Sequence, residues 1–350
     1  MKGTIKKWCP FLFTYKNRLS VLLSMQNSHY PIPVTVLTGF LGAGKTSVLN
    51  QLIKQNRDKR LVVLENEFGD ISIDSELVFK GDNELFEISS GCICCSMNGE
   101  FNETLAKLVQ EFPVFDHLVV ESTGIADPSA IAAAFVGDHI IQAHFKLNAV
   151  ICLVDAQNLQ EQLTEREEVT KQIAFSDVVV VNKVDLVDAQ QLTLVEKAIK
   201  NINPYVQLIT AKYGEQNTVD LLNLDAYEAR KVEQGFRFLP INLQTSHEDV
   251  VSHAFVFDQP LDLLKFRHWL NVLLVIQGES FYRVKGVMNF AGLDERHIVQ
   301  SVMKNATYTL GSDWEQGMVR TSKIVFIGKK LRRDLLEKGL KNCYSDFSFV

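Results

Sequence analysis

VTVLTGFLGAGKT, residues 34–46, is the strongest indication of the fold in this sequence. It begins with an apolar run, VTVLT, and continues into GFLGAGKT, which fits the pattern G-x-x-x-x-G-K-[ST]. Glycines let backbone N–H groups turn toward phosphate oxygens, and the helix predicted after the loop directs its positive end at them. In this pattern Lys45 reaches the β- and γ-phosphates, and the hydroxyl of Thr46 binds Mg²⁺. The sequence therefore predicts a strand, a phosphate loop and a helix.

From Val34 onward, short β-rich runs alternate with longer stretches of helical spacing, such as TSVLNQLIKQ and FNETLAKLVQEF. Near-continuous apolar strands joined by helical crossovers are typical of a parallel sheet covered on both faces. In such sheets the ligand binds at the carboxyl ends of the strands. We predict an α/β fold with a mostly parallel, doubly wound sheet built from VTVLTG, RLVVLENE, HLVVEST, AVICLVDA, DVVVVNK and VQLITAK.

The pattern changes after about Leu224. DAYEARKVEQGFRFLP is a charged connection, and the segment from Ser252 has strands and helices in an order typical of a small α+β domain with an antiparallel sheet. Arg283 and Lys285, in the strand-like FYRVKGVMNF, are expected on a solvated strand face, with contact to an acidic partner as the alternative. We predict an N-terminal extension at 1–30, a P-loop domain at 31–225, a linker at 226–250 and an α+β domain at 251–345.

The composition is that of a soluble globular protein, with 46% hydrophobic and 22% charged residues among 350. The formal net charge is −6, although residues 1–25 carry five cations and no acid. An acidic body argues against nucleic acid or an anionic membrane as the main partner, because either favours a basic face. No run of about 18 uncharged apolar residues is present, so the sequence predicts no membrane-spanning helix.

The N-terminal residues and the cysteines bear on cellular setting. Residues 1–30 are expected to be a disordered extension, or a start placed too early, with Met25 as the alternative start. Six cysteines are present, but a chain with this much core does not need disulfides. Cys152, inside AVICLVDA, is most simply a small buried hydrophobe. We therefore expect a reducing, cytoplasmic setting.

The base-binding residues are predicted from VVVVNKVDL, residues 178–186. The carboxylate of Asp185 accepts hydrogen bonds from both N1–H and the 2-amino group of guanine. Adenine lacks that pair of donors, so the sequence favours GTP over ATP. The stem of Lys183 packs along the base plane, while Asn182 fixes the loop. ITAKYG, residues 209–214, is either a second base loop or a plain strand-to-helix turn.

Acidic residues follow two of the predicted strands. HLVVESTG ends in Glu121, a candidate to hold the Mg²⁺ shell or the attacking water, and Gly124, where the backbone can meet the γ-phosphate. Taken singly, clustered acids in a loop are usually solvated surface. Beside a phosphate site, the acids of ENEFGDISID are candidates for Mg²⁺ contact, water positioning or metal binding: Glu65, Glu67, Asp70 and Asp74.

GCICC, residues 91–95, places three thiols within four positions: Cys92, Cys94 and Cys95. Thiolates this close repel one another and are easily oxidised unless a cation offsets their charge. Zn²⁺ does so, with Zn–S distances of about 2.3 Å and four ligands. A carboxylate from ENEFGD, a His or a second subunit would supply the fourth ligand. The alternatives are chance clustering or a redox pair, although a catalytic disulfide is more often C-x-x-C.

Five motifs in this order resemble those of the CobW-type (G3E) P-loop GTPases, in particular the YjiA-like subgroup: GFLGAGKT, ENEFG, GCICC, ESTGIADP and NKVD. The resemblance runs from about Pro33 to Gly328, since YRVKGVMNF, SDW and KIVFIG also resemble the family's C-terminal domain, although these motifs are weaker than the first five. It implies a SIMIBI-class G domain, a CobW C-terminal domain and slow GTP hydrolysis. It also implies Zn²⁺, or another transition metal such as Co²⁺, at the CxCC motif. Family members are regarded as metallochaperones or insertases whose nucleotide state governs metal hold and release.

The family's functional residues carry over by position. The implied nucleotide contacts are Gly39, Gly42, Ala43, Gly44, Lys45, Thr46, Ser47, Gly124, Asn182, Lys183 and Asp185, with Mg²⁺ on Thr46. The catalytic candidates are Lys45, Asp70 and Glu121. The implied zinc ligands are Cys92, Cys94 and Cys95, to which Glu65 and Asp70 can be added.

Two departures from the family pattern stand out. Ser47 replaces a second Thr but keeps a hydroxyl, and only His247 and His253 lie where many relatives carry a His-rich stretch. The expected partners are a client metalloprotein and a second copy of the chain, with no nucleic acid or membrane. The rival functions are a metal or redox sensor without insertase activity, and a P-loop small-molecule kinase.

Overall fold

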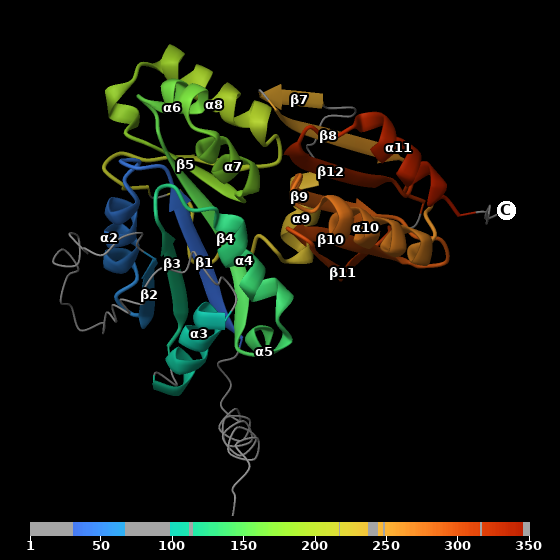
Figure 1. The fold of residues 1–350 in the computed structure, drawn as a ribbon, viewed down its shortest axis with the longest axis horizontal. Coiled ribbons are helices and arrows are strands. Elements are labelled where there is room, and N and C mark those ends of the chain that lie inside the picture. Colours follow the sequence, from blue (N-terminus) through green and yellow to red (C-terminus); the bar gives the residue numbers. More distant parts are fainter. Residues whose placement is uncertain are drawn as a thin grey trace, which may run out of the picture.

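The computed structural model describes residues 31–66, 99–111, 115–216, 218–236, 244–247, 249–315 and 317–345. They form two sheets, one in each half of the chain (Figure 1). None of the helices in these ranges has the length and apolar character that crossing a membrane requires. The predicted N-terminal extension lies outside the described residues.

The first sheet has six parallel strands in the order β2-β3-β1-β4-β5-β6. The apolar runs of the sequence form these strands because their side chains are buried on both faces of the sheet. The predicted parallel, doubly wound sheet is therefore confirmed. Its strands are β1 (Ile32–Gly39), β2 (Leu61–Asn66), β3 (His117–Ser122), β4 (Phe145–Asp155), β5 (Val178–Asn182) and β6 (Gln207–Thr210).

Helices cover both faces of this sheet. On one face, Val36 of β1 joins a core with Phe101 and Phe135 from two helices, while on the other Leu37 joins a core with Leu49. Asp127 and Asp188 cap two of the helices with their side chains. The described helices of this half are α2 (Lys45–Gln55), α3 (Gly99–Glu111), α4 (Pro128–Gly137), α5 (His139–Gln142), α6 (Leu159–Glu165), α7 (Glu167–Phe175), the 3₁₀ turn η2 (Val184–Leu186), α8 (Ala189–Ile202) and α9 (Ala229–Phe236).

The second sheet is antiparallel, in the order β11-β10-β9-β12-β8-β7. One face is covered by two helices, from which Phe266 and Leu336 join a core with Phe326. The α+β prediction is confirmed. The elements are β7 (Gln244–His247), β8 (Val250–Phe257), α10 (Leu263–Gln277), β9 (Phe281–Met288), β10 (Glu295–Val302), β11 (Asn305–Asp313), β12 (Ser322–Lys329) and α11 (Arg333–Asn342).

The other face of the second sheet packs against the first half of the chain. Val325 and Ile327 of β12 share one buried cluster with Ile199 of α8 and Phe236 of α9. The segment predicted as a linker, 226–250, contains α9 and β7, and α9 contacts β9 and β11. The described residues of this segment are therefore part of the folded contact between the two halves.

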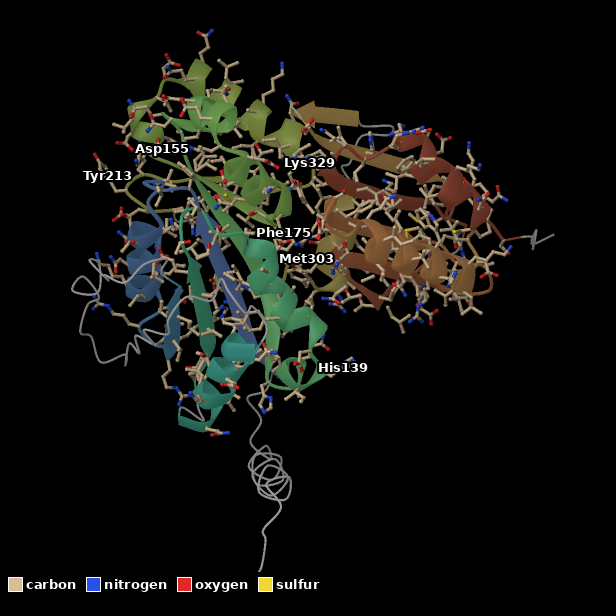
Figure 2. The ribbon with its side chains drawn as sticks, viewed as in Figure 1. His139, Asp155, Phe175, Tyr213, Met303 and Lys329 are labelled. Atoms are coloured by element: carbon tan, nitrogen blue, oxygen red, sulfur yellow. The ribbon has the colours of Figure 1, made fainter. Side chains whose placement is uncertain are left out.

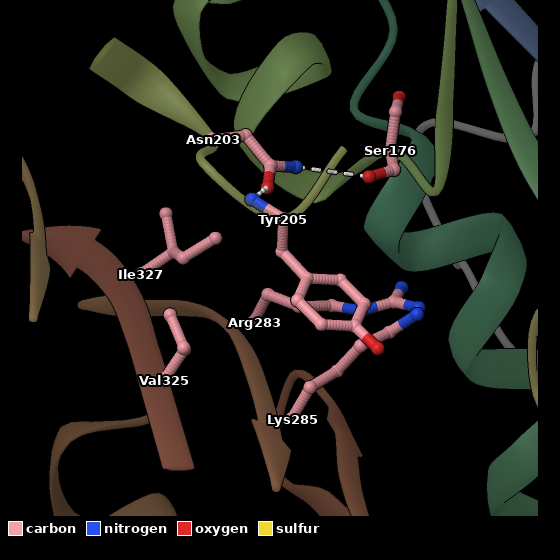
Figure 3. A pocket seen from close by; sticks show the side chains of 7 residues that line it. All are labelled: Ser176, Asn203, Tyr205, Arg283, Lys285, Val325 and Ile327. Atoms are coloured by element: carbon pink, nitrogen blue, oxygen red, sulfur yellow. Dashed lines mark hydrogen bonds between the residues drawn. The ribbon is translucent and has the colours of Figure 1, made fainter. Parts of the chain in front are cut away.

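Three charged residues meet inside this contact, and we call them the interdomain ion cluster: Asp177, Arg283 and Lys285. Their side chains are 2%, 3% and 7% exposed. Arg283 pairs with Asp177, and Lys285 Nζ lies 2.7 Å from the same carboxylate oxygen. Figure 3 shows both cations beside Tyr205. The expectation of a solvated strand face for Arg283 and Lys285 is therefore wrong, because β9 lies inside the sheet and faces the first domain.

The charges in the interdomain ion cluster shift one another's ionisation. Burial acts to raise the pKa of Asp177, but the charges of Arg283 and Lys285 lower it below its usual value. Burial lowers the pKa of Lys285 to about 8, although the carboxylate of Asp177 acts in the opposite direction. Arg283 also donates to the hydroxyl of Tyr227 at 2.7 Å and to the carbonyl of Phe175 at 3.2 Å. These partners compensate for the burial of the charges.

A buried polar chain crosses the first sheet at the start of β3. His117 Nε2 lies 2.8 Å from Thr35 Oγ1, which also accepts from Asn148 Nδ2 at 2.8 Å. Burial lowers the pKa of His117 to about 4. The folded state therefore keeps this imidazole neutral at pH values where the unfolded chain already binds a proton.

We expect the free energy of unfolding to fall as the pH drops from about 6.5 to 4, because only the unfolded state protonates His117 in that window. The contribution of this residue is about 3 kcal/mol and is complete near pH 4. Urea denaturation between pH 7 and pH 4 measures it. The variant His117→Gln, which cannot titrate, should lose less stability over this range than the wild type. An identical pH profile for both proteins would contradict the prediction.

Candidate nucleotide-binding site

The carboxyl ends of the parallel strands bring the predicted nucleotide motifs to one edge of the first sheet (Figure 1). The phosphate loop follows β1, the loop with Gly124 follows β3, and the loop with Asn182 ends β5. β1 pairs with both β3 and β4, and β4 pairs with β5. The loops predicted to hold phosphate and base are therefore neighbours in space.

Two glycines of the phosphate loop occupy positions that no other residue fits. Gly39 has φ +143°, and a Cβ there would lie 2.4 Å from the carbonyl oxygen of Leu153. Gly44 has φ +99°, and its Cβ would lie 2.3 Å from Nδ2 of Asn182. The loop thus runs directly against the ends of β4 and β5. This tight passage gives the G-x-x-x-x-G spacing its structural reason.

The loop leads into the start of α2 at Lys45. The N-cap residue, Gly44, has no side chain that could accept hydrogen bonds from the first amides of the helix, and the first turn contains no acidic residue. The first amides of such a helix are suited to an anion. Thr46 and Ser47 are exposed in this first turn, whereas Ala43 is buried and Gly42, with φ +77°, has open space around it.

The side chain of Lys45, the first residue of α2, reaches back across the phosphate loop. Its Nζ donates to the carbonyl of Gly39 at 2.9 Å. Burial lowers the pKa of Lys45, while the charge of Glu121 acts to raise it. A phosphate beside this ammonium would favour its charged form further, because an added negative charge opposes the effect of burial.

Oxygen ligands suited to Mg²⁺ surround the phosphate loop. The hydroxyls of Thr38, Ser122 and Thr123 are buried, and none has a hydrogen-bond partner within the described part of the chain. They lie at the ends of β1 and β3, where Glu121 also lies. Hydroxyl, carboxylate and water oxygens are the ligands that Mg²⁺ prefers. The donor set therefore fits the ion, with Thr46 and Glu121 as the residues that would hold it or its waters.

On the base side, Asn182 joins three loops. Its side chain is buried, its Nδ2 donates to the carbonyl of Ala43 at 3.0 Å, and its Oδ1 accepts from the amide of Gly214 at 3.1 Å. The phosphate loop, the end of β5 and the loop of ITAKYG are thus fixed together. This observation supports the role predicted for Asn182, and it places the loop of ITAKYG next to the phosphate loop.

Lys183 pairs with a carboxylate, that of Asp155, which the sequence motifs did not indicate. Its backbone has φ +60°, and its Nζ lies 2.6 Å from Oδ2 of Asp155 at the end of β4 (Figure 2). Burial acts to raise the pKa of Asp155, but hydrogen bonds from Lys183 and Asn158 lower it. The signal was present in AVICLVDA, as an acid at the carboxyl end of an apolar strand.

Asp185 lies on η2 and is exposed, as a base-reading carboxylate requires. We expect Asp185→Asn to weaken GDP binding about 10²-fold, because one of two charge-assisted hydrogen bonds is replaced by opposed donors. Binding of xanthosine diphosphate should strengthen, since its C2 carbonyl accepts from the new amide. Titration with fluorescent derivatives of both nucleotides measures the change. The control is Asp188→Asn, which retains the cap of α8. Unchanged GDP affinity in Asp185→Asn would contradict this role.

The predicted metal ligands are placed only in part. Cys92, Cys94, Cys95, Asp70 and the acids Glu67 and Asp74 lie outside the described residues. Within the residues that the structure describes, no group of three or more His, Cys, Asp or Glu side chains gathers as a metal site. Glu65 lies in β2, where its backbone pairs in register with Glu121 of β3. The last described residues before the segment that contains the thiols therefore lie beside the nucleotide site.

His247 and His253, the two histidines of TSHEDVVSHAF, lie on neighbouring strands of the second sheet. His253 is buried in β8 and its Nε2 lies 3.0 Å from the carbonyl of Leu331. Burial lowers its pKa. His247 lies at the end of β7, the neighbouring strand, paired with Val250. His253 therefore serves the packing of β8 against the segment that leads into α11.

Comparisons with known proteins agree with this arrangement. Residues 33–210 match the CobW/HypB/UreG nucleotide-binding domain, and residues 250–344 match the cobalamin synthesis protein CobW C-terminal domain. The zinc chaperone YjiA of Escherichia coli is 30% identical over 310 residues, covering 86% of this chain and 95% of that protein. The zinc-regulated GTPase metalloprotein activator 1 of Schizosaccharomyces pombe is 29% identical, covering 87% and 84%.

A solved structure gives the same result. The crystal structure of Zn(II)-bound YjiA GTPase from E. coli superposes with a TM-score of 0.70 at 26% identity, covering 90% of this chain and 99% of that one. The two matched domains follow one another in this chain, and together they span most of the described residues. This chain belongs to the CobW/HypB/UreG family, with the CobW C-terminal domain following its nucleotide-binding domain.

Proposed function

We propose that this protein is a slow GTPase that carries zinc as its cargo and transfers it to a client metalloprotein. One observation gives the main support for GTP binding. The side chain of Asn182 hydrogen-bonds both to the phosphate loop and to the loop of ITAKYG, which supports a role for the NKVD motif in nucleotide binding. The names of the relatives, a zinc chaperone and a zinc-regulated GTPase metalloprotein activator, support the cargo and the client.

GTP hydrolysis would use the residues around the phosphate loop. Lys45 binds the β- and γ-phosphates, Thr46 holds Mg²⁺, and Glu121, with Asp70, positions the attacking water. Bound Mg²⁺ would neutralise the charge that develops on the phosphate oxygens. The nucleotide motifs contain no Arg to act as a finger, so turnover is slow and contact with a client or a second copy accelerates it.

Zinc is the cargo, held through the thiolates of Cys92, Cys94 and Cys95. Glu65 or Asp70 supplies the fourth ligand, and the preference for four ligands leaves zinc transferable when one of them moves. Because Glu65 pairs with Glu121 across β2 and β3, movement at the γ-phosphate reaches the start of the thiol segment through one strand pair. Co²⁺ or another transition metal suits the same ligands.

The proposed thiol and GTP chemistry indicates the cellular compartment and the kind of partner. Free thiols and a GTP-dependent reaction belong in the reducing cytoplasm, and the acidic chain needs neither nucleic acid nor membrane as a partner. A homodimer is one way to complete the zinc site. The role in guanine recognition that we propose for Asp185 argues against the rival kinase function. The rival sensor function predicts full activity in cells after Lys45→Ala.

A zinc titration with a competing chromophoric chelator tests the cargo. Wild-type protein should bind one zinc tightly, and the triple variant Cys92→Ser, Cys94→Ser, Cys95→Ser should lose at least about 10²-fold in affinity, because three of four ligands are gone. The control is Cys343→Ala, since burial raises the pKa of Cys343 to about 11 and keeps that thiol protonated. Equal zinc affinity in the triple variant and the wild type would reject the thiol site.

A further inference from the structure

Helix α7 lies in the first domain at its boundary with the second sheet (Figure 1). Its first residue, Glu167, pairs with Lys329 of β12 at 2.8 Å. Its last residue, Phe175, accepts at its carbonyl from Arg283 of β9 at 3.2 Å, and the guanidinium lies 5.3 Å from the Phe175 ring. Figure 2 shows Phe175 and Lys329 on this boundary. The C-terminal domain thus contacts both ends of α7.

The same helix reaches the loop that follows β3. Gln172 is 1% exposed, and its Nε2 donates to two carbonyls of that loop, those of Gly124 at 3.1 Å and Ala126 at 3.2 Å. The loop carries the residues expected to meet the γ-phosphate. One amide group on α7 therefore binds two backbone groups of the loop that senses hydrolysis.

The opposite side of this loop meets the phosphate loop. A Cβ on Gly124 would lie 2.7 Å from the backbone nitrogen of Leu41 and 2.7 Å from its side chain. The loop after β3 is thus in van der Waals contact with the phosphate loop on one side and bound by Gln172 on the other. A shift of α7 must therefore change either these hydrogen bonds or the contact with Leu41.

Gln172 has a feature that packing alone does not explain. Its Oε1 is buried and accepts no hydrogen bond from any residue within the described ranges. A buried acceptor without a partner costs free energy, so an apolar side chain would serve a purely structural position better. The two donated hydrogen bonds are what distinguishes this side chain from an apolar one.

We propose that Gln172 is a positioning residue for GTP hydrolysis. The C-terminal domain contacts α7, and Gln172 on α7 holds the loop at 123–126 in its position against the phosphate loop. The inference rests on the proposed GTPase function. It makes the C-terminal domain a regulator of turnover: a client that moves this domain changes the hydrogen bonds of Gln172. The residue acts on the loop and does not contact the nucleotide.

The test compares Gln172→Met, which keeps the length of the side chain but has no donor, with wild type. We expect kcat for GTP hydrolysis to change about tenfold, because two hydrogen bonds to the loop are lost, while GDP affinity stays within about twofold. Amide hydrogen exchange at 123–126 should quicken in the GDP-bound protein. The matched control is Thr170→Val, a buried polar residue of the same helix whose Oγ1 has no partner among the described residues.

Coupling to the C-terminal domain is tested by Lys329→Glu, which places two carboxylates together at the start of α7. It should change kcat about two- to fivefold in the wild-type background and not in Gln172→Met. Additive effects of the two changes would overturn the coupling. Wild-type kcat and exchange rates in Gln172→Met would overturn the positioning role, as would an equal loss of kcat and GDP affinity. If Gln172→Met does not fold, Gln172→Leu takes its place.

These outcomes are separable from failure of the proposed function. Absence of GTP turnover in the wild-type protein would reject the GTPase proposal itself. In that case the exchange rates at 123–126 in Gln172→Met and Lys329→Glu still decide whether Gln172 holds the loop and whether the C-terminal domain acts on it.

Discussion

Lys45→Ala is expected to lower kcat/KM for GTP hydrolysis by about 10²–10³-fold, because one preorganised charge at the transferring phosphoryl group is removed. Nucleotide binding should weaken as well, since Lys45 reaches the phosphates in the ground state too. A phosphate-release assay at saturating and limiting GTP, together with GDP titration, separates the two effects.

The matched control for Lys45→Ala is Lys54→Ala, an exposed lysine in the last turn of the same helix. It should remain within about twofold of wild type, because surface charges at this distance are largely screened. A loss of less than tenfold in Lys45→Ala would remove Lys45 from the catalytic role and, with it, the phosphate-loop mechanism.

Asp177→Ala is expected to destabilise the protein by about 3–5 kcal/mol, since it leaves Arg283 and Lys285 buried without their carboxylate. Urea denaturation at pH 7 measures the change. Raising the pH toward 10 should restore part of the stability of this variant. Without Asp177, the attraction that keeps Lys285 protonated is gone, so folding favours the neutral amine more strongly.

The control for Asp177→Ala is Asp294→Ala. That carboxylate pairs with Arg320, but its side chain is 88% exposed, so its loss should cost less than about 1 kcal/mol. Replacing all three residues of the interdomain ion cluster by apolar ones should be milder than Asp177→Ala, because no unpaired charge then stays buried. A loss below 1 kcal/mol in Asp177→Ala would mean that water reaches the cluster.

Local sequence pattern predicted most of the fold because most strands of the first sheet are apolar runs and each nucleotide motif follows such a run. VVVVNKVDL illustrates this, since β5 and the residues at its end are adjacent in the chain. Asn182 could likewise be placed on the base side. The partners of its side chain, Ala43 and Gly214, come from segments distant in sequence, so only the fold brings them together.

The interdomain contacts could not be predicted in this way. In FYRVKGVMNF, cations alternate with apolar residues, as they do on a strand with one solvated face. The charged face meets Asp177, a residue about 100 positions away, and no local periodicity carries that information. The buried position of Gln172 could not be predicted either, because a polar residue in an amphipathic helix normally faces water.

In the proposed function, the nucleotide state governs how tightly zinc is held. The most direct measurement is the equilibrium zinc affinity of the full chain, with Mg²⁺ present, saturated either with GDP or with a non-hydrolysable GTP analogue. We expect affinities that differ by about 5–150-fold, the range of an allosteric coupling of about 1–3 kcal/mol. Equal affinities in the two states would contradict it.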